Sequence, residues 1–134
     1  MIHTLFRVMV VEDDGILAAA LEQAFADAGV THIVICPSTE AALHALDDAR
    51  PDAVVIDVHL TDRDDGWAIA ELVGMLGPRP PRIAFSTGSP QDIPPRIAEM
   101  GQVFAKPYDP SDLVRALCEV EKGGLLHRLR SAIG

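Results

Sequence analysis

Short runs of apolar and β-branched residues alternate with longer segments of helical periodicity along this chain of 134 residues. This alternation constrains the fold most, because strand–helix–strand units with right-handed crossovers build a parallel sheet. The apolar runs are nearly continuous, as in strands covered by helices on both faces. The pattern predicts an α/β protein with a doubly wound, five-stranded parallel sheet, for which the common strand order is 2-1-3-4-5.

The individual elements can be placed from periodicity, caps and prolines. Strands are expected at Leu5–Val11, Ile33–Cys36, Ala53–Val58, Ile83–Phe85 and Val103–Ala105. Helices of ordinary length are expected at Gly15–Ala28, from an N-cap at Ser38 to before Pro51, near Trp67–Leu76, and from an N-cap at Asp109 to about Lys122.

Two segments are irregular. Pro90, Pro94 and Pro95 leave room for only about two helical turns before the fifth strand, so the fourth helix should be short or irregular. After Gly123-Gly124, an apolar stripe beside two arginines predicts a short amphipathic helix. We therefore expect a domain at residues 1–122 and an extension at 123–134, which either folds over the domain or binds a partner.

Charge and composition argue against two kinds of partner. The formal net charge is −9 and 4% of residues are aromatic, whereas nucleic-acid-binding surfaces are basic and often carry stacking rings. No run of about 18 apolar residues is present, and no signal-peptide pattern opens the chain. We expect no nucleic acid, no membrane and a cytoplasmic location. Cys36 and Cys118 are too far apart in sequence for metal spacing and read as core residues.

Polar side chains follow four of the predicted strands at the point where each strand ends. They are Glu12, Asp13 and Asp14 after the first strand, Asp57 at the third, Ser86 and Thr87 at the fourth, and Lys106 after the fifth. In a doubly wound sheet, ligands bind outside the carboxyl ends of the strands. We therefore expect acids, a hydroxyl group and an ammonium group to meet at one edge.

Carboxylates crowded together repel one another unless a cation lies between them. Mg²⁺ suits Glu12, Asp13 and Asp57, because it prefers oxygen ligands and commonly binds one or two carboxylates with phosphate oxygens. A carboxylate can also attack phosphorus as a nucleophile. Asp57 is the best candidate because it lies within an apolar run, and Lys106 and Thr87 would stabilise the charge of the transferred group.

Each signal also has a plain structural explanation. An acidic triplet after a strand is often a solvated helix N-terminus, an aspartate at a strand end is often a turn residue, and Lys-Pro is common in loops. Two rival functions stay open: a phosphorylation-independent protein-binding module, and a small hydrolase that uses Asp57 transiently. The sequence offers no cap domain for a hydrolase pocket. The occurrence of all these residues at strand ends favours phosphoryl transfer.

Over roughly residues 5–122 the chain resembles the receiver domains of two-component response regulators. The matching pieces are Val10–Asp14, Val54–Asp57, Thr87-Gly88 and Lys106-Pro107. The resemblance implies a flavodoxin-like fold and phosphoryl transfer to Asp57 from a histidine kinase or a histidine phosphotransfer protein. It implies Mg²⁺ held by Glu12, Asp13, Asp57 and the main-chain carbonyl of His59, with Thr87 and Lys106 on the phosphoryl oxygens. A downstream protein effector would receive the signal, and the chain would be a monomer or weak homodimer.

The chain also departs from that family. Val103 stands where many receivers carry an aromatic switch residue, and the loop at 59–66 lacks the usual proline and is one residue longer. Phe85–Gly88 is similar to the Phe-Ala-Thr-Gly subgroup of single-domain receivers, which tends to share these departures. We therefore expect residues 88–102 to shift on phosphorylation. His59 would either modulate dephosphorylation or be an ordinary solvent-facing residue.

Overall fold

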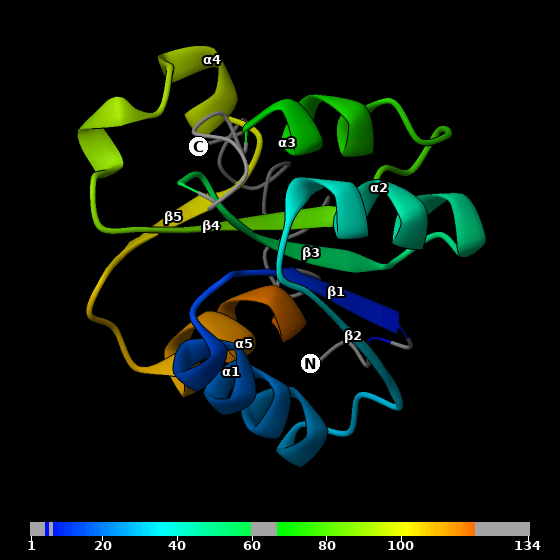
Figure 1. Cartoon of the computed structure of the whole chain (residues 1–134), viewed down its shortest axis with the longest axis vertical. Helices are drawn as coiled ribbons and strands as arrows, with labels where there is room; N and C mark the ends of the chain where they lie inside the picture. Colours follow the sequence, from blue (N-terminus) through cyan, green and yellow to red (C-terminus); the bar gives the residue numbers. More distant parts are fainter. Residues whose placement is uncertain (1–4, 6, 60–66, 120–134) are drawn as a thin grey trace, which may run out of the picture.

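The protein is described here by a computed structural model, which covers residue 5 and residues 7–59 and 67–119. Figure 1 shows one sheet between two layers of helices. The strands are β1 Arg7–Val11, β2 His32–Cys36, β3 Ala53–Asp57, β4 Arg82–Thr87 and β5 Gln102–Ala105. The helices are α1 Gly15–Asp27, α2 Thr39–Asp48, α3 Trp67–Gly74, the 3₁₀ turn η1 Pro90–Asp92, α4 Pro95–Ala98 and α5 Pro110–Cys118.

The sheet is parallel throughout, with the strand order β2-β1-β3-β4-β5. The predicted fold class and strand order are confirmed. The strand order reverses at β1 and β3, which lie side by side although α1, β2 and α2 separate them in sequence. Such a switch point opens a crevice at the carboxyl ends of the two strands.

Apolar side chains fill both faces of the sheet. Val54 and Ile56 point into the core with Phe85, whereas Val55 points into the opposite core with Phe25. Alternation of side chains along a strand explains why β3 is apolar at consecutive positions: each face has its own core. Figure 1 shows α1 and α5 below the sheet and α2, α3 and α4 above it.

Side-chain caps begin three of the helices. Ser38 and Asp109 each accept a backbone N–H of the helix that follows, at 3.1 and 2.9 Å, as predicted. Asp14 Oδ1 accepts the N–H groups of Ile16 and Leu17 at 2.9 and 3.3 Å. Asp14 is therefore the N-cap of α1, the structural role that an acid at a helix N-terminus often has.

Element boundaries differ from the predicted ones by a few residues. β1 begins at Arg7 rather than Leu5, β3 ends one residue earlier than predicted, and α3 ends at Gly74. α4 is one turn of four residues, shorter than the two turns expected. It must end before Gly101, where a Cβ atom would lie 2.1 Å from the Ile83 carbonyl oxygen. Only glycine lets the chain pass this close to β4.

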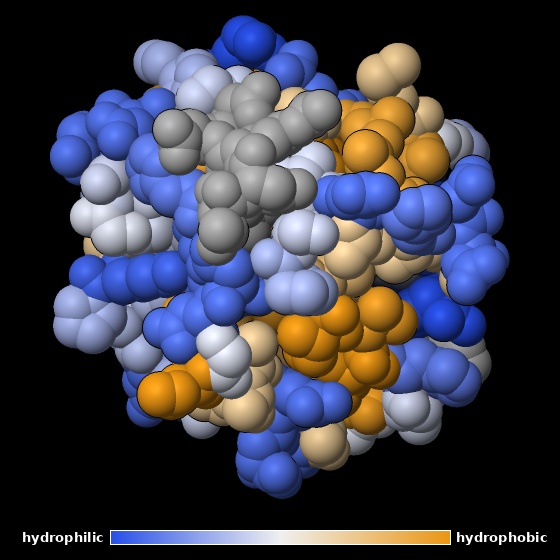
Figure 2. Space-filling view, in the orientation of Figure 1, coloured by the Kyte–Doolittle hydropathy of each residue, from blue (hydrophilic) through white to orange (hydrophobic). Residues whose placement is uncertain are grey.

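Parts of the predictions concern residues outside the described ranges. These are the loop residues 60–66, the predicted end of the last helix at 120–122 and the predicted amphipathic extension at 123–134. Among the described residues, no helix has the length and apolarity needed to cross a membrane. Figure 2 shows apolar surface near the end of α3, divided by hydrophilic residues from a second apolar area over the β1–β2 side.

Candidate functional site

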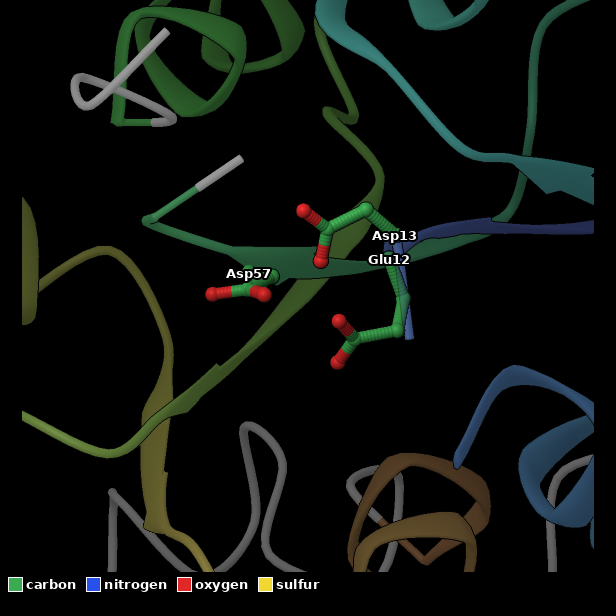
Figure 3. A group of neighbouring side chains, drawn as sticks. All are labelled: Glu12, Asp13 and Asp57. Atoms are coloured by element: carbon green, nitrogen blue, oxygen red, sulfur yellow. The ribbon is translucent and has the colours of Figure 1, made fainter. Parts of the chain in front are cut away.

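The predicted residues meet at the carboxyl edge of the sheet. Glu12 and Asp13 follow β1, Asp57 is the last residue of β3, Thr87 ends β4, and Lys106 follows β5. The strand register aligns these residues along the same edge of the sheet. Asp57 lies opposite Ser86 on β4, and the Lys106 N–H donates to the Thr87 carbonyl at 2.8 Å. Figure 3 shows the carboxylates of Glu12, Asp13 and Asp57 around one space.

Three carboxylates form a group of the kind that holds a metal ion. One oxygen from each of Glu12, Asp13 and Asp57 lies within 4.8 Å of the others. Glu12 is 1% exposed and Asp57 4% exposed, whereas Asp13 faces solvent. The group is therefore sealed on the protein side and open on the Asp13 side.

Lys106 supplies the positive charge of the site. Its Nζ lies 2.9 Å from Glu12 Oε1 and 3.2 Å from Asp57 Oδ2. The contact to Asp57 is aligned as a hydrogen bond, whereas Glu12 Oε1 is buried and accepts no well-aligned hydrogen bond among the described residues. The Lys106–Glu12 contact is thus a close ion pair between an ammonium group and a buried carboxylate oxygen.

The crowding changes the proton affinity of two groups. Burial, followed by the neighbouring Asp57 carboxylate, raises the pKa of Glu12 to about 7, and the ammonium group of Lys106 offsets only part of this. For Lys106, burial works to lower the pKa, but its contacts with Glu12 and Asp57 outweigh burial and the net pKa is raised. Lys106 therefore stays charged at neutral pH, while the protein alone does not fully compensate the Glu12 carboxylate.

These features fit a divalent cation. Mg²⁺ takes oxygen ligands and retains water molecules, and the site offers carboxylate oxygens with one solvent-facing side. The buried Glu12 oxygen without an aligned hydrogen bond is the kind of group that a cation satisfies, directly or through water. The donor set has no thiolate or imidazole that would favour a softer metal.

The two loops that leave β3 and β4 bond back onto the site. The His59 N–H donates to Asp57 Oδ1 at 3.0 Å, which places the main chain of His59 beside the acidic group. Thr87 is fully buried, and its Oγ1 accepts the Ser89 N–H at 2.9 Å. The Thr87 hydroxyl can therefore still donate its own proton to an acceptor in the cleft.

The sequence analysis missed the contacts of two residues beside the site, Tyr108 and Asp92. The Tyr108 hydroxyl group hydrogen-bonds Ser86 Oγ at 2.7 Å, and its ring packs on Phe104 at a centroid distance of 5.7 Å. His59 Nε2 lies 3.2 Å from Asp92 Oδ2 in η1. Tyr108 could have been suspected as an aromatic residue directly after Lys106-Pro107, but no motif or spacing indicates Asp92.

Comparison with known families gives one match. The family model described as response regulator receiver domain matches residues 8–118. Among curated proteins, none matches this chain in sequence.

Several solved structures share the fold. A response regulator receiver domain (CheY-like) from Methylobacillus flagellatus has a TM-score of 0.74 and 23% identity, covering 87% of this chain and 98% of that one. The chemotaxis response regulator CheY4 of Vibrio cholerae has a TM-score of 0.71 and 22% identity, with coverages of 87% and 99%. The response regulator PhyR from Brucella abortus has a TM-score of 0.71 and 23% identity, covering 98% of this chain.

The chain spans only 52% of that PhyR structure. At this level of identity, the structural matches establish the fold alone, and function has to be argued from the site.

Proposed function

Because the chain belongs to the response regulator receiver domain family, we propose that it accepts a phosphoryl group on Asp57 and passes a signal to a protein partner. The donor would be the phosphohistidine of a histidine kinase or a histidine phosphotransfer protein. One observation supports the proposal most strongly. The ammonium group of Lys106 lies within 3.2 Å of both Asp57 and Glu12, beside the group of three carboxylates.

The proposed transfer forms one bond and breaks one. An oxygen of the Asp57 carboxylate attacks phosphorus, an O–P bond forms, and the P–N bond to the donor imidazole breaks with its electron pair leaving on nitrogen. The transferred group carries its charge on three equatorial oxygens. Lys106 would bind one of them, and the 3.2 Å distance from its Nζ to an Asp57 oxygen supports this role.

Glu12, Asp13, Asp57 and the main-chain carbonyl of His59 would hold Mg²⁺. When bound, the cation neutralises the charge that develops between the carboxylate and the phosphoryl group. Thr87 would donate its hydroxyl proton to a phosphoryl oxygen, since its oxygen is already held by Ser89 from the other side. In this scheme the protein catalyses its own phosphorylation and dephosphorylation and has no separate substrate.

The proposed switch does not depend on the rotation of an aromatic side chain at position 103. Val103 is half-buried against the core on the α3 side of the sheet. Between β4 and the start of β5 at Gln102, the chain forms the turn η1 and the single-turn α4, whose backbone hydrogen bonds are short-range and resist movement less than a sheet ladder does. We therefore place the output in this segment, as in the Phe-Ala-Thr-Gly subgroup that Phe85–Gly88 resembles.

We propose that the donor protein docks beside the site. Ile16, in the first turn of α1 directly after the acidic group, is 86% exposed. An apolar side chain this exposed next to a reactive centre suits contact with a donor protein. Residues 1–122 would form the receiver, acting as a monomer or weak homodimer, and 123–134 an extension that folds back or binds the effector.

Phosphorylation by a small donor tests the proposal without a known kinase. The chain is incubated with acetyl phosphate and Mg²⁺, and its intact mass is measured. We expect the mass of one phosphoryl group to be added, and no addition with a chelator or in Asp57→Asn. An unmodified wild-type protein at saturating Mg²⁺ would instead favour a binding module that does not use phosphorylation.

A further inference from the structure

The loops that follow β3 and β4 are joined by a side-chain bridge. His59 Nε2, in the loop after β3, lies 3.2 Å from Asp92 Oδ2 in η1 after β4. The two side chains are 40% and 49% exposed. An ion pair at such exposure adds little to the free energy of unfolding. Any role of this pair therefore comes from its position between the two loops.

Both ends of this bridge bond to residues of the site. The His59 N–H donates to Asp57 Oδ1 at 3.0 Å. On the other side, the Asp92 N–H donates to the Ser89 carbonyl and the Ser89 N–H donates to Thr87 Oγ1, both at 2.9 Å. Asp57, His59, Asp92, Ser89 and Thr87 are therefore joined by a continuous chain of contacts that runs from the end of β3 to the end of β4.

This chain of contacts borders the place where a phosphoryl group would sit. β3 and β4 are neighbours in the sheet, and Asp57 and Thr87 occupy their carboxyl ends. A group bonded to Asp57 and contacted by Thr87 has to lie between the two loops. The His59–Asp92 bridge crosses from one of these loops to the other.

We propose that Asp92 is a positioning residue that holds the His59 imidazole across this gap and limits the access of water to the phosphoryl group on Asp57. The inference rests on the proposed function, because it needs a phosphoryl group at Asp57. Asp92 touches neither that group nor the cation and acts only through His59.

The lifetime of the phosphorylated protein tests this role. The full chain is phosphorylated with acetyl phosphate and Mg²⁺, the donor is removed, and loss of the phosphoryl mass is followed with time. Asp92→Ala and His59→Ala each remove one end of the bridge, and His59→Ala keeps the main-chain N–H and carbonyl. We expect each to shorten the lifetime about two- to fivefold, the range available from an exposed pair.

Two comparisons separate the bridge from other effects. In His59→Ala/Asp92→Ala the lifetime should fall no further than in either single variant, because both remove the same contact. Asp92→Asn should keep a lifetime close to wild type, since an amide oxygen in the place of the carboxylate oxygen can accept an imidazole N–H. Arg96→Ala is the matched control: it breaks the 3.0 Å Arg96–Glu71 pair of the neighbouring α4 and should change nothing.

An unchanged or longer lifetime in Asp92→Ala would overturn the inference. So would effects that multiply in the double variant, or an Asp92→Asn lifetime as short as that of Asp92→Ala, which would assign the effect to charge alone. Failure of the proposed function looks different, because the wild-type chain would then take up no phosphoryl group at all.

Discussion

Lys106 Nζ lies 3.2 Å from Asp57 Oδ2, although 49 residues separate the two in sequence. They also lie at the carboxyl ends of strands that are not neighbours, because β4 lies between β3 and β5. The lysine side chain therefore extends over the end of β4 to reach the carboxylate. In a buried acidic group this contact would provide the positive charge that the proposed phosphoryl transfer to Asp57 needs.

Removal of the Lys106 charge should slow phosphorylation. In Lys106→Met we expect the rate with acetyl phosphate at saturating Mg²⁺ to fall by about a hundredfold, as when one charge-stabilising donor is lost from an active site. Intact-mass time courses measure this rate. Arg115→Met, which removes an exposed cation of α5, is the control and should react like wild type. Equal rates for the two variants would contradict the role of Lys106.

The raised pKa of Glu12 predicts how stability depends on pH without metal. Its pKa is about 7 in the folded protein against an ordinary 4.5. Between these values the folded state keeps a proton that the unfolded state has lost, so the free energy of unfolding should fall as pH rises. Urea titrations with a chelator should show this fall in wild type and a smaller one in Glu12→Gln.

Mg²⁺ should reverse that trend, because it binds the deprotonated carboxylate and releases the proton. Stability that rises with pH over the same interval in the metal-free protein would contradict the account of Glu12.

Asp14 should matter for the stability of α1 and not for chemistry. Its carboxylate caps the helix through the N–H groups of Ile16 and Leu17, so Asp14→Ala should lower the free energy of unfolding by about 1 kcal/mol. Asp14→Ser, which can still cap, should recover most of the loss. Phosphorylation by acetyl phosphate should proceed at the wild-type rate in both. A loss of Mg²⁺ binding in Asp14→Ser would mean that Asp14 belongs to the cation site.

Ile16 should matter only when the donor is a protein. In Ile16→Ser we expect slower transfer from a phosphorylated histidine kinase and an unchanged rate with acetyl phosphate, because the small donor needs no docking surface. Met75→Ser, which changes a residue that is 79% exposed just after α3, is the matched control and should leave both rates unchanged. Equal losses with the two donors would place the effect in the site itself.

Thr87 should link phosphorylation to residues 88–102. Amide exchange over this segment should change when a stable phosphoryl mimic is added to wild type, because Thr87 moves toward the new oxygens and draws with it Ser89, whose N–H it accepts. In Thr87→Ala the change should be absent although the mimic still binds. Identical protection across 88–102 with and without the mimic in wild type would rule out this switch.

Much of the fold could be predicted because local patterns and tertiary structure agree. Strand β3 is apolar at consecutive positions, and the sheet does bury both of its faces. The strand order follows from general rules of crossover handedness. The length of α4 was harder to predict, because the chain has to return to the sheet at Gly101, which packs closely on the Ile83 backbone, and no local pattern encodes that contact.

Some residues of the site could also be predicted from the sequence, and others could not. Asp57, Thr87 and Lys106 could be placed together because parallel strands end at one edge. Asp14 and Asp13 are adjacent acids in sequence, and only the geometry separates a helix cap from a member of the acidic group. Asp92 escaped prediction because its partner, His59, lies 33 positions away on another loop, and neither residue type is unusual in a loop.

The most direct test of the central claim is to locate the phosphoryl group. The chain is phosphorylated with acetyl phosphate and Mg²⁺, and borohydride then reduces the acyl phosphate to an alcohol that survives peptide mass mapping. We predict reduction at Asp57 and at no other carboxylate. Reduction at Asp13 or Glu12, or a phosphorylated wild-type protein with residue 57 unmodified, would contradict the account.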